Sequence, residues 1–350
     1  MKEGWEYKTF ETCLEKVNKT KKIPSSNYLK EGFYPIVSQE ESLINGFHNN
    51  HNDIFKINHP IVIFGDHTRI LKYIDFDFVI GADGVKILSP IPSLLPKFFY
   101  YSLKSLRLPS LGYSRHYKLL KEQRIPVPPL EEQKRIVEEL DLLSGIIEKQ
   151  KQQLKELDTL AQYIFYDMFG DPVTNEKGWE VKKLGKVSNN LDSYRKPVTK
   201  ADRQPGPYPY YGASGIVDYV SNFIFDGIYL LVSEDGANLL ARNQPIAFLS
   251  YGKVWINNHA HVLDFKDHSS KIYLMFYLNL LDLKDRVKGA AQPKLTQKDL
   301  NDINLSWPPL PLQNLFASKI EAIEKQKADI TKSIEETQKL FDYTMDKYFG

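Results

Sequence analysis

The sequence predicts an α+β protein: two mixed α/β domains joined by two long helices that form an antiparallel coiled coil, with an approximate two-fold relation between its halves. Three observations predict this fold class. The same Pro-Pro-Leu helix opening begins at Pro128 and again at Pro308, 180 residues later. Apolar residues follow each opening in alternating three- and four-residue steps, the spacing of a coiled-coil seam. The segments before the openings contain short runs rich in Val, Ile, Tyr and Phe, typical of strands.

The first long helix is expected within residues 128–170. Proline forces extended backbone before the helix and is tolerated in its first turn. Glu131 and Glu132 complement the positive end of the helix dipole, and Gly170 can supply the left-handed residue that ends a helix. The seam of this helix is predicted to contain Ile136, Leu140, Leu143, Ile147, Gln150, Leu154, Leu157 and Ile164.

The second long helix, within residues 308–350, follows the same register without insertion or deletion and also finishes on Phe-Gly. A helix this long with a single apolar stripe needs a partner, and the simplest partner is its copy in the same chain. The pairing residues of the second helix are predicted to be Phe316, Ile320, Ile323, Lys327, Ile330, Ile334 and Phe341.

Polar residues interrupt both stripes near their middles, Gln150 in the first helix and Lys327 in the second. Buried polar residues in a seam fix the register and orientation of paired helices, at some cost in stability. The alternative is that both side chains lie at an exposed edge of the seam.

The two remaining segments, residues 1–127 and 171–307, repeat more loosely. The tripeptide Gly-Trp-Glu begins at Gly4 and at Gly178. Strands are predicted at IVIF (61–64), FVIG (78–81), YLLV (229–232) and IAFL (246–249), and helical spacing at KFFYYSLKSL (97–106) and SKIYLMFYLNLLDL (270–283). Each segment is therefore expected to be a mixed α/β domain.

Composition favours a globular protein of a reducing compartment. Cys13 is the single cysteine of the 350 residues, so no internal disulfide can form, and neither a targeting pattern nor an apolar run of about 20 residues is present. We expect a cytoplasmic protein with no membrane contact. The two domain segments carry net charges of +5 and +2, and the two helical segments carry −4 and −1, which weakly favours domains that face a polyanion.

This architecture resembles the specificity subunit of type I restriction-modification enzymes. The resemblance covers essentially the whole chain, and its residues are PPLEEQKRIVEEL from Pro128, PPLPLQ from Pro308, both Gly-Trp-Glu copies, YPYYGASG from Tyr208 and KGAAQPKLTQKDLNDINLSWPPL from Lys288. The first domain departs from the pattern, since SRHYKLLKEQRIPVPPL from Ser114 replaces the Gln-Pro-Lys form.

The resemblance implies that residues 1–127 and 171–307 are target recognition domains and that residues 128–170 and 308–350 are spacer helices. Each domain would read one half of a split, asymmetric site in double-stranded DNA. Two methyltransferase subunits, which bind S-adenosylmethionine, and restriction subunits are the implied partners, and we expect N6-methylation of adenine at the site.

Motifs for chemistry are missing from the sequence. The Pro-Pro pairs follow Val127 and Trp307 rather than the Asn or Asp that an adenine methyltransferase needs, and neither Gly-Lys pair is followed by Ser or Thr as in a phosphate-binding loop. The histidine pairs at 48/51 and 259/261 are more typical of surface or structural residues than of metal ligands. The chain is not expected to be an enzyme by itself, or to hold a cofactor or metal.

Polar and basic loop residues with aromatic neighbours are the candidates for DNA contact, through base edges or phosphates. For each of them, a solvated loop side chain is the alternative. The candidates in the second domain are Lys288, Gly289, Gln292, Lys294 and Thr296. Their positional counterparts in the first domain are Tyr113, Ser114, Arg115, His116, Tyr117 and Lys118. Further candidates are Arg69, Arg195, Lys196, Tyr211, Ser214, Asn238 and Arg242.

Two other function classes stay open. A coiled-coil scaffold whose domains bind protein would explain the helices without any nucleic acid, but its binding would not weaken steeply with salt as DNA binding does. An RNA-binding or antiviral accessory protein could use similar domains, and competition with RNA would identify it.

Overall fold

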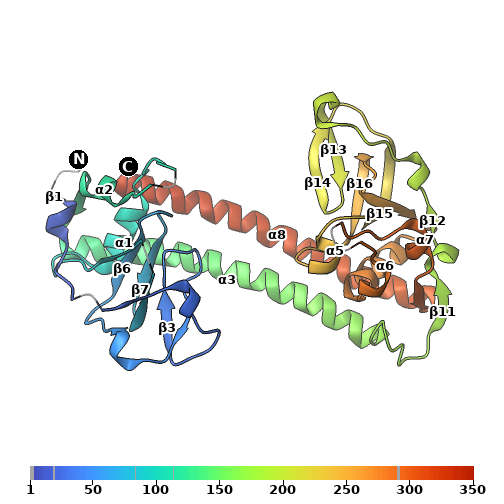
Figure 1. Ribbon diagram of the computed structural model, residues 1–350. Helices are drawn as coiled ribbons and strands as arrows, with labels where there is room; N and C mark the ends of the chain where they lie inside the picture. Colours follow the sequence, from blue (N-terminus) through green and yellow to red (C-terminus); the bar gives the residue numbers. More distant parts are fainter. Residues whose placement is uncertain (1–3, 19, 83, 113, 290–291) are drawn as a thin grey trace. The chain divides into compact units, whose positions relative to one another are not determined.

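The computed structural model describes residues 4–18, 20–82, 84–112, 114–289 and 292–350, and the chain forms two compact units (Figure 1). Unit 1 is Met1–Lys151 with Lys332–Gly350, and unit 2 is Gln152–Thr331. Each unit therefore contains one mixed α/β domain, one part of the first long helix and one part of the second.

The two long helices are α3, Leu130–Phe169, and α8, Leu310–Phe349. Both begin directly after a Pro-Pro step, as predicted. The backbone N–H of Gly170 donates to the Tyr166 carbonyl at 2.8 Å, and Gly170 has φ +76°, the left-handed conformation that ends a helix without a steric penalty. The predicted long helices are thus confirmed.

Within unit 1, α3 and α8 run antiparallel. The Arg135 guanidinium donates to the Tyr348 hydroxyl at 3.0 Å, while Gln150, further along α3, donates to the Ser333 hydroxyl at 2.7 Å, earlier on α8. Residues later in α3 thus contact residues earlier in α8, as antiparallel pairing requires. The Tyr348 hydroxyl also donates to Glu139 at 2.5 Å.

Within unit 2, the other parts of α3 and α8 pair in the same sense. Lys327 of α8 lies 2.7 Å from Asp158 of α3, and the rings of Phe165 and Phe316 meet with centroids 5.7 Å apart. Burial lowers the pKa of Lys327, but its hydrogen bonds and ion pairs with Asp158 and Glu324 outweigh this and raise it. The antiparallel pairing predicted from the sequence is confirmed in both units.

The polar seam residues Gln150 and Lys327 therefore contact the facing helix, each within its own unit. Gln150 is partly buried and bonds across the seam, and the side chain of Lys327 is 25% exposed while it bridges to Asp158. Of the two interpretations of these residues, the structure favours side chains at the helix contact.

A buried glutamine fixes the start of each long helix on its own domain. Gln133 and Gln313 each donate a side-chain N–H to the carbonyl of the first proline of their Pro-Pro step, at 2.8 Å in both cases. Gln133 also accepts from the Leu95 N–H at 2.7 Å, and Gln313 accepts from the Ser270 hydroxyl at 2.8 Å. Both glutamines are almost fully buried, so these bonds are shielded from water.

The domain of unit 1 is built from short strands and short helices. In one sheet, β1 pairs with β10. A second sheet has the order β2-β8-β3-β4, with β5 also paired to β8. In a third sheet, β6 lies between β7 and β9. The strands are β1 Glu6–Thr9, β2 Lys22–Ile23, β3 Tyr34–Val37, β4 Gly46–His48, β5 Ile54–Phe55, β6 Ile61–Gly65, β7 Leu71–Ile74, β8 Phe78–Gly81, β9 Val85–Leu88 and β10 Arg124–Val127. The helices are α1 Pro96–Lys104 and α2 Tyr117–Lys121.

The domain of unit 2 is built around longer strands. Its main sheet has the order β12-β17-β15-β16-β13-β14, and β11 pairs with β18. The strands are β11 Glu180–Lys183, β12 Asn189–Asn190, β13 Pro205–Gly212, β14 Gly215–Val220, β15 Phe225–Ser233, β16 Ala247–Ile256, β17 Ala260–Asp264 and β18 Asn304–Trp307. The helices are α4 Leu184–Val187, α5 Asn238–Ala241, α6 His268–Leu280 and α7 Gln297–Asn301.

The strand pairing places the chain ends of each domain together at the start of its long helix. β1 and β10 pair antiparallel in unit 1, and β11 and β18 pair antiparallel in unit 2. Because β10 and β18 lead directly into the Pro-Pro steps, each domain presents its own first strand and the start of one long helix at the same edge. The predicted mixed α/β character of both domains is confirmed.

The core of each unit is continuous with its part of the long helices. In unit 1, Phe98 and Phe99 of α1 pack in one apolar cluster with Ile136 and Leu140 of α3 and Phe341 of α8. Complete burial of such a side chain stabilises by about 1.5–3 kcal/mol. The domain is thus anchored on the helices by apolar burial.

In unit 2 an aromatic cluster does the same. Phe165 of α3 stacks on Tyr273 of α6 with centroids 5.7 Å apart, and Phe169 meets the same tyrosine at 4.8 Å. The Tyr273 hydroxyl donates to the Ser306 carbonyl at 2.5 Å, so its polar end is satisfied in the core. Among the helices of the described residues, none is long and apolar enough to cross a membrane.

Candidate nucleic-acid interface

The candidates from Lys288 to Thr296 lie in one loop that precedes α7 in unit 2. Lys288 and Lys294 pair their backbones across the base of this loop, with N–O distances of 2.9 and 2.8 Å. Gly289 has φ +87°, and a Cβ there would lie 2.5 Å from the carbonyl oxygen of Gln292, so the turn requires glycine. Gln292 itself is exposed. We call its described residues, Lys288–Gly289 and Gln292–Thr296, the second loop.

Two candidates of the second loop, Lys288 and Thr296, share Asp299 as a partner. Thr296 is the N-cap of α7: its hydroxyl oxygen accepts from the Asp299 N–H at 3.2 Å, and its hydroxyl donates to the Asp299 carboxylate at 2.6 Å. The Lys288 ammonium lies 2.9 Å from both oxygens of the same carboxylate. The Lys288 side chain is 69% exposed, so it can still exchange this partner for a phosphate.

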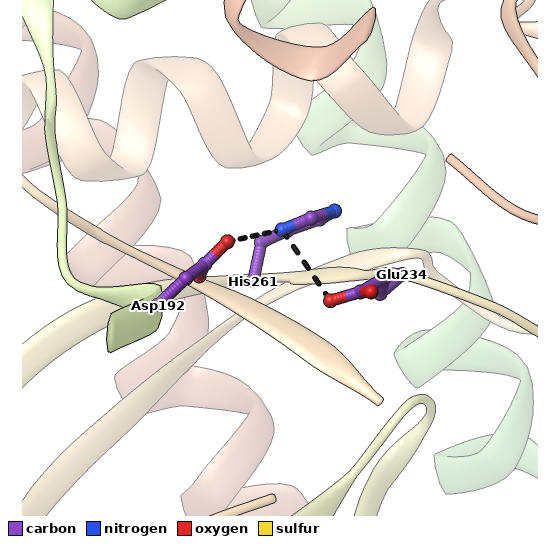
Figure 2. A group of neighbouring side chains, drawn as sticks. All are labelled: Asp192, Glu234 and His261. Carbon is purple, nitrogen blue, oxygen red and sulfur yellow. Dashed lines mark hydrogen bonds and ion pairs between the residues drawn. The ribbon is translucent and has the colours of Figure 1, made fainter. Parts of the chain in front are cut away.

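A largely buried charge network lies against the second loop, and Figure 2 shows three of its members, Asp192, Glu234 and His261. It consists of Asp192, Arg195, Glu234, His261 and Lys294, and we call it the carboxylate network. His261 Nδ1 lies 2.6 Å from Asp192 and 3.7 Å from Glu234. Arg195 lies 2.6 Å from one oxygen of Glu234, and Lys294 lies 2.9 Å from the other. Opposite charges thus alternate through the network.

His261 connects the network to the second loop. Its Nε2 lies 2.8 Å from the carbonyl oxygen of Leu295. A carbonyl oxygen only accepts, so Nε2 carries a hydrogen. Nδ1 faces the Asp192 carboxylate, which also only accepts when ionised, and the geometry therefore assigns a hydrogen to both ring nitrogens.

Burial and charge act in opposite directions on the two carboxylates of the network. Burial favours the neutral acid and by itself raises the pKa of Asp192 and of Glu234. The hydrogen bond and charge of His261 outweigh burial at Asp192, and the bonds from Arg195 and Lys294 outweigh it at Glu234, so both pKa values fall below their ordinary range. Both groups are therefore ionised at neutral pH.

Asp192, Glu234 and His261 also have the geometry of a possible metal site, since their ligand atoms lie within 4.8 Å of one another in the described part of the chain. Their donors are already in use. Both oxygens of Glu234 accept from Arg195 and Lys294, and Asp192 accepts from His261 and a backbone N–H. A divalent cation would have to displace cationic side chains, so these residues fit an internal ion network better than a metal centre.

Arg195 and Lys196 have different environments although they are neighbours. The Arg195 side chain is only 12% exposed and also donates to the Ala260 carbonyl at 2.8 Å, so it is committed to the interior of unit 2. Lys196 is exposed, and its carbonyl accepts from the Trp255 indole N–H at 2.7 Å. Of this pair, only Lys196 can reach a phosphate in the described conformation.

Asn238 and Arg242, at the two ends of α5, bond to backbone groups of unit 2. The Asn238 amide accepts from the Gln244 N–H and donates to the Gln244 carbonyl, both at 3.0 Å. Arg242 has the unusual φ of +53° and donates to the Leu281 carbonyl at 2.7 Å. Both residues hold the local fold.

Tyr211 and Ser214 lie in the β13–β14 hairpin. Tyr211 is largely buried and stacks on Phe248 with centroids 6.1 Å apart, whereas Ser214 is exposed at the turn. Tyr219 on β14 is 53% exposed and was not predicted from the sequence. The sequence of β14, GIVDYV, has no clear alternation that could have indicated it.

In unit 1, the counterpart segment Ser114–Lys118 precedes and begins α2; we call it the first loop. His116 is almost fully buried: its Nδ1 lies 3.0 Å from the Asp66 carbonyl, and its Nε2 accepts from the Leu111 N–H at 3.0 Å. A ring nitrogen that accepts carries no hydrogen, so the proton is on Nδ1. His116 is therefore an internal residue.

The other candidates of the first loop divide between buried and exposed positions. Tyr117 is half-buried, and its ring meets Phe10 edge-on at 5.9 Å. Ser114, Arg115 and Lys118 are exposed. Tyr113, also a candidate, lies outside the described residues.

Arg69 lies in a tight turn after β6. It has φ +62°, and its backbone N–H donates to the Gly65 carbonyl at 2.7 Å. Its guanidinium donates to the Leu108 carbonyl at 2.9 Å. This arginine thus ties two loops of unit 1 together.

Sequence reasoning missed Asp66 and Glu234, the buried carboxylates that contact these loops. The signal was present, because each residue lies two positions after an apolar run that predicts a buried strand, and acidic residues are seldom buried unless they are paired.

Comparison with known proteins agrees with this arrangement. A family model described as the type I restriction modification DNA specificity domain matches residues 2–158 and 176–339. A Haemophilus influenzae protein provisionally named a type I restriction enzyme specificity subunit is 35% identical over 144 residues, which are 41% of this chain and 37% of that protein. The specificity subunit of the type I restriction enzyme MpnII from Mycoplasma pneumoniae is 30% identical over 160 residues, 43% of this chain and 46% of that protein.

These matches span less than half the length of those two relatives. Among solved structures, the S subunit of a type I restriction-modification system from M. genitalium has a TM-score of 0.63 at 17% identity and covers 99% of this chain and 96% of that chain. A chain from a structure that concerns complex assembly and conformational transition of the type I R-M system has a TM-score of 0.53 at 16% identity. It covers 99% of this chain and 98% of that one. At these identities the likeness shows the fold.

The family model accounts for most of the chain in two copies, one for each mixed α/β domain. The chain therefore belongs to the family of type I restriction modification DNA specificity proteins.

Proposed function

We propose that this chain reads an asymmetric, bipartite site in double-stranded DNA and directs methyltransferase and restriction subunits to it. The observation that carries the proposal is the presence of two specificity domains in one chain with different residues in corresponding loops. Unlike loops would read unlike half-sites. The exposed residues available for contact include Arg115 and Lys118 in the first loop and Lys288 and Gln292 in the second.

The chemistry of these loops suits DNA. Lys and Arg neutralise phosphates and release counterions, while Arg to guanine and Gln to adenine are the common bidentate base contacts in the major groove. We assign phosphate contact first to Lys118 and Lys288, and base contact first to Arg115 and Gln292. The buried candidates, His116 and Arg195 above all, support the loops from inside.

We further propose that the catalytic groups come from the partners. S-adenosylmethionine would be held by methyltransferase subunits, which would flip the target adenine into their own pocket. This chain would supply recognition alone.

The test is to co-express the full chain with its methyltransferase partner and to sequence the methylated genome. We expect one consensus made of two unlike halves separated by unspecified bases, with N6-methyladenine in both halves. Methylation without a split consensus would contradict the proposal.

DNA binding by the same complex separates this proposal from a protein-binding scaffold. A reader should lose affinity steeply between 50 and 200 mM salt, by about 10³-fold or more if several phosphates are contacted, and should still prefer its own site. Binding that is indifferent to salt and to sequence would favour the scaffold.

A further inference from the structure

Asp66 of unit 1 and Glu234 of unit 2 occupy corresponding places, each directly after a central strand of its domain. Asp66 follows β6, and Glu234 follows β15. They are 2% and 9% exposed. Burying a charge is costly unless partners compensate it, so two buried carboxylates at matching positions require a reason.

The backbone contacts of the two residues match as well. The N–H of Asp66 donates to the Gly84 carbonyl at 2.7 Å, and the N–H of Glu234 donates to the His259 carbonyl at 2.9 Å. Their carbonyls accept from the loops that hold the DNA candidates, Asp66 from the His116 N–H at 2.7 Å and Glu234 from the Leu295 N–H at 2.8 Å. Each residue therefore joins a central strand to a candidate reading loop.

The side chains add a second connection, and its chemistry differs between the units. Asp66 accepts from the Tyr117 N–H at 2.8 Å and lies 3.3 Å from the Lys86 ammonium, which in turn lies over the Tyr117 ring at 5.1 Å. Glu234 lies 2.6 Å from Arg195 and 2.9 Å from Lys294. Each carboxylate thus orients candidate residues of its own domain.

We propose that Asp66 and Glu234 are positioning residues that set base selection in the first and second loops, each for its own half-site. This inference rests on the proposed function, because it needs each domain to read one half. Neither residue has to touch DNA. A reading side chain selects among bases only when its backbone is held at one distance and angle from the groove. Removing the carboxylate charge loosens the side-chain attachment of the loop, while the backbone bonds of Asp66 and Glu234, the strands and the long helices remain.

The test uses Asp66→Asn and Glu234→Gln in the full chain, co-expressed with the methyltransferase partner and read out by the methylated consensus. For Glu234→Gln we expect base preference in one half-site to fall by roughly tenfold, the size of one lost base contact, while the other half keeps its preference. For Asp66→Asn we expect the reverse result: base preference falls in the half-site read by the first loop, and the half-site read by the second loop keeps its preference. Thermal unfolding of the same variants records how far the fold is affected.

Matched controls are Glu11→Gln in unit 1 and Asp302→Asn in unit 2, which remove carboxylates that also pair with a lysine at 2.7 Å but lie outside the loops. They should leave both half-sites unchanged. If Glu234→Gln does not fold, Lys294→Gln removes the loop side of the same ion pair without leaving a bare buried carboxylate, and it should relax the same half-site.

The outcomes distinguish the inference from the function on which it rests. A wild-type complex without a split consensus overturns both. A normal wild-type consensus that the Asp66 and Glu234 variants retain in full, or lose equally in both halves, overturns the inference and leaves the proposed function standing.

Discussion

At the scale of single residues, several charged candidates for DNA contact serve the fold. Arg195 and Lys294 neutralise the buried Glu234, and the His261 ring links Asp192 to the second loop. A basic residue in a loop is therefore an ambiguous signal in a sequence. Only the position of its carboxylate partner, which for Arg195 and Lys294 is distant along the chain, decides between ligand contact and internal pairing.

Asp192→Asn should destabilise unit 2 at neutral pH. The substitution removes a buried charge and leaves His261 and Arg195 partly uncompensated, which typically costs about 3–5 kcal/mol. The folded pKa of Asp192 is lowered, so its contribution to stability is present above the unfolded pKa and is lost as pH falls through the folded value. Thermal unfolding at pH 7 and below pH 4 should show the difference between wild type and variant shrinking in acid.

The control for this prediction is Asp302→Asn, which removes an exposed ion pair with Lys183 and should change the unfolding temperature little. An Asp192→Asn protein as stable as the wild type at pH 7 would show that the carboxylate network does not hold unit 2 together.

Lys72 should make the stability of unit 1 rise with pH. Its ammonium is almost fully buried and donates to the Ser42 carbonyl at 2.5 Å and to Asn45 at 3.1 Å. Burial lowers the pKa of Lys72 to about 8, although the charge of Glu40 acts in the opposite direction. Between pH 8 and the ordinary lysine value, the unfolded chain binds more protons than the folded one, and stability therefore increases with pH.

The measurement compares the wild type with Lys72→Met from pH 7.5 to pH 10. Relative to the variant, the wild type should gain roughly 2 kcal/mol of unfolding free energy across this window. Lys56→Met, at an exposed position, is the control and should follow the wild type. A constant difference between wild type and Lys72→Met would mean that this lysine titrates normally.

At the scale of helices and strands, much of the fold could be predicted because the relevant signals are local. Pro-Pro steps and an alternating three- and four-residue period require no knowledge of distant residues, and α3 and α8 were predicted with their boundaries nearly correct. The β13–β14 hairpin was not predicted, since its PYPYYGASG sequence lacks a clear alternation.

The candidate site could be located only in part. The loops before α2 and α7 follow from the repeat, but the support that Asp66 and Glu234 give them depends on pairings across 51 and 60 residues, such as those with Tyr117 and Lys294. No local pattern specifies such pairings. For this reason the sequence predicts DNA contact equally for loop residues that are exposed and for loop residues that are buried.

The long helices also carry a repeated exposed pair that lies outside the seam. Leu160 and Tyr163 of α3, in unit 2, are 44% and 66% exposed; Leu340 and Tyr343 of α8, in unit 1, are 52% and 68% exposed. The same residue types thus recur 180 positions apart on the solvent face. Exposed apolar residues mark interaction surfaces when they cluster. If the chain assembles with two methyltransferase subunits as proposed above, we expect each pair to contact one of them.

Replacing one pair, Leu160→Glu with Tyr163→Glu, should remove one of two methyltransferase copies from the complex. Charged side chains cannot be buried in an apolar contact without a large desolvation cost. Native mass spectrometry of the purified complex measures the stoichiometry directly. The control is Thr159→Glu, a neighbouring exposed residue, and a full complement of partners on the double variant would contradict this docking site.

At the scale of the whole molecule, the proposed function requires the two domains to read half-sites that lie at a fixed distance from each other. We propose that the paired helices set this distance. Inserting four residues after Lys151 in α3 and four after Thr331 in α8 would lengthen the pair by about 6 Å at 1.5 Å per residue. That is nearly two base pairs at about 3.4 Å each, and a four-residue insertion unwinds a coiled coil only locally.

The methylated consensus of the double-insertion protein should keep both half-sites and gain one or two unspecified base pairs between them. Two base pairs also turn the duplex by roughly 70°, so the complex must twist the DNA or the helices, and we expect slower methylation than in the wild type. An insertion in α3 alone would shift its seam against an unchanged α8, and this protein should lose methylation. If the double insertion leaves the spacing unchanged, the distance between half-sites is set by the loops or by the partner subunits, and the helices serve only to join the domains.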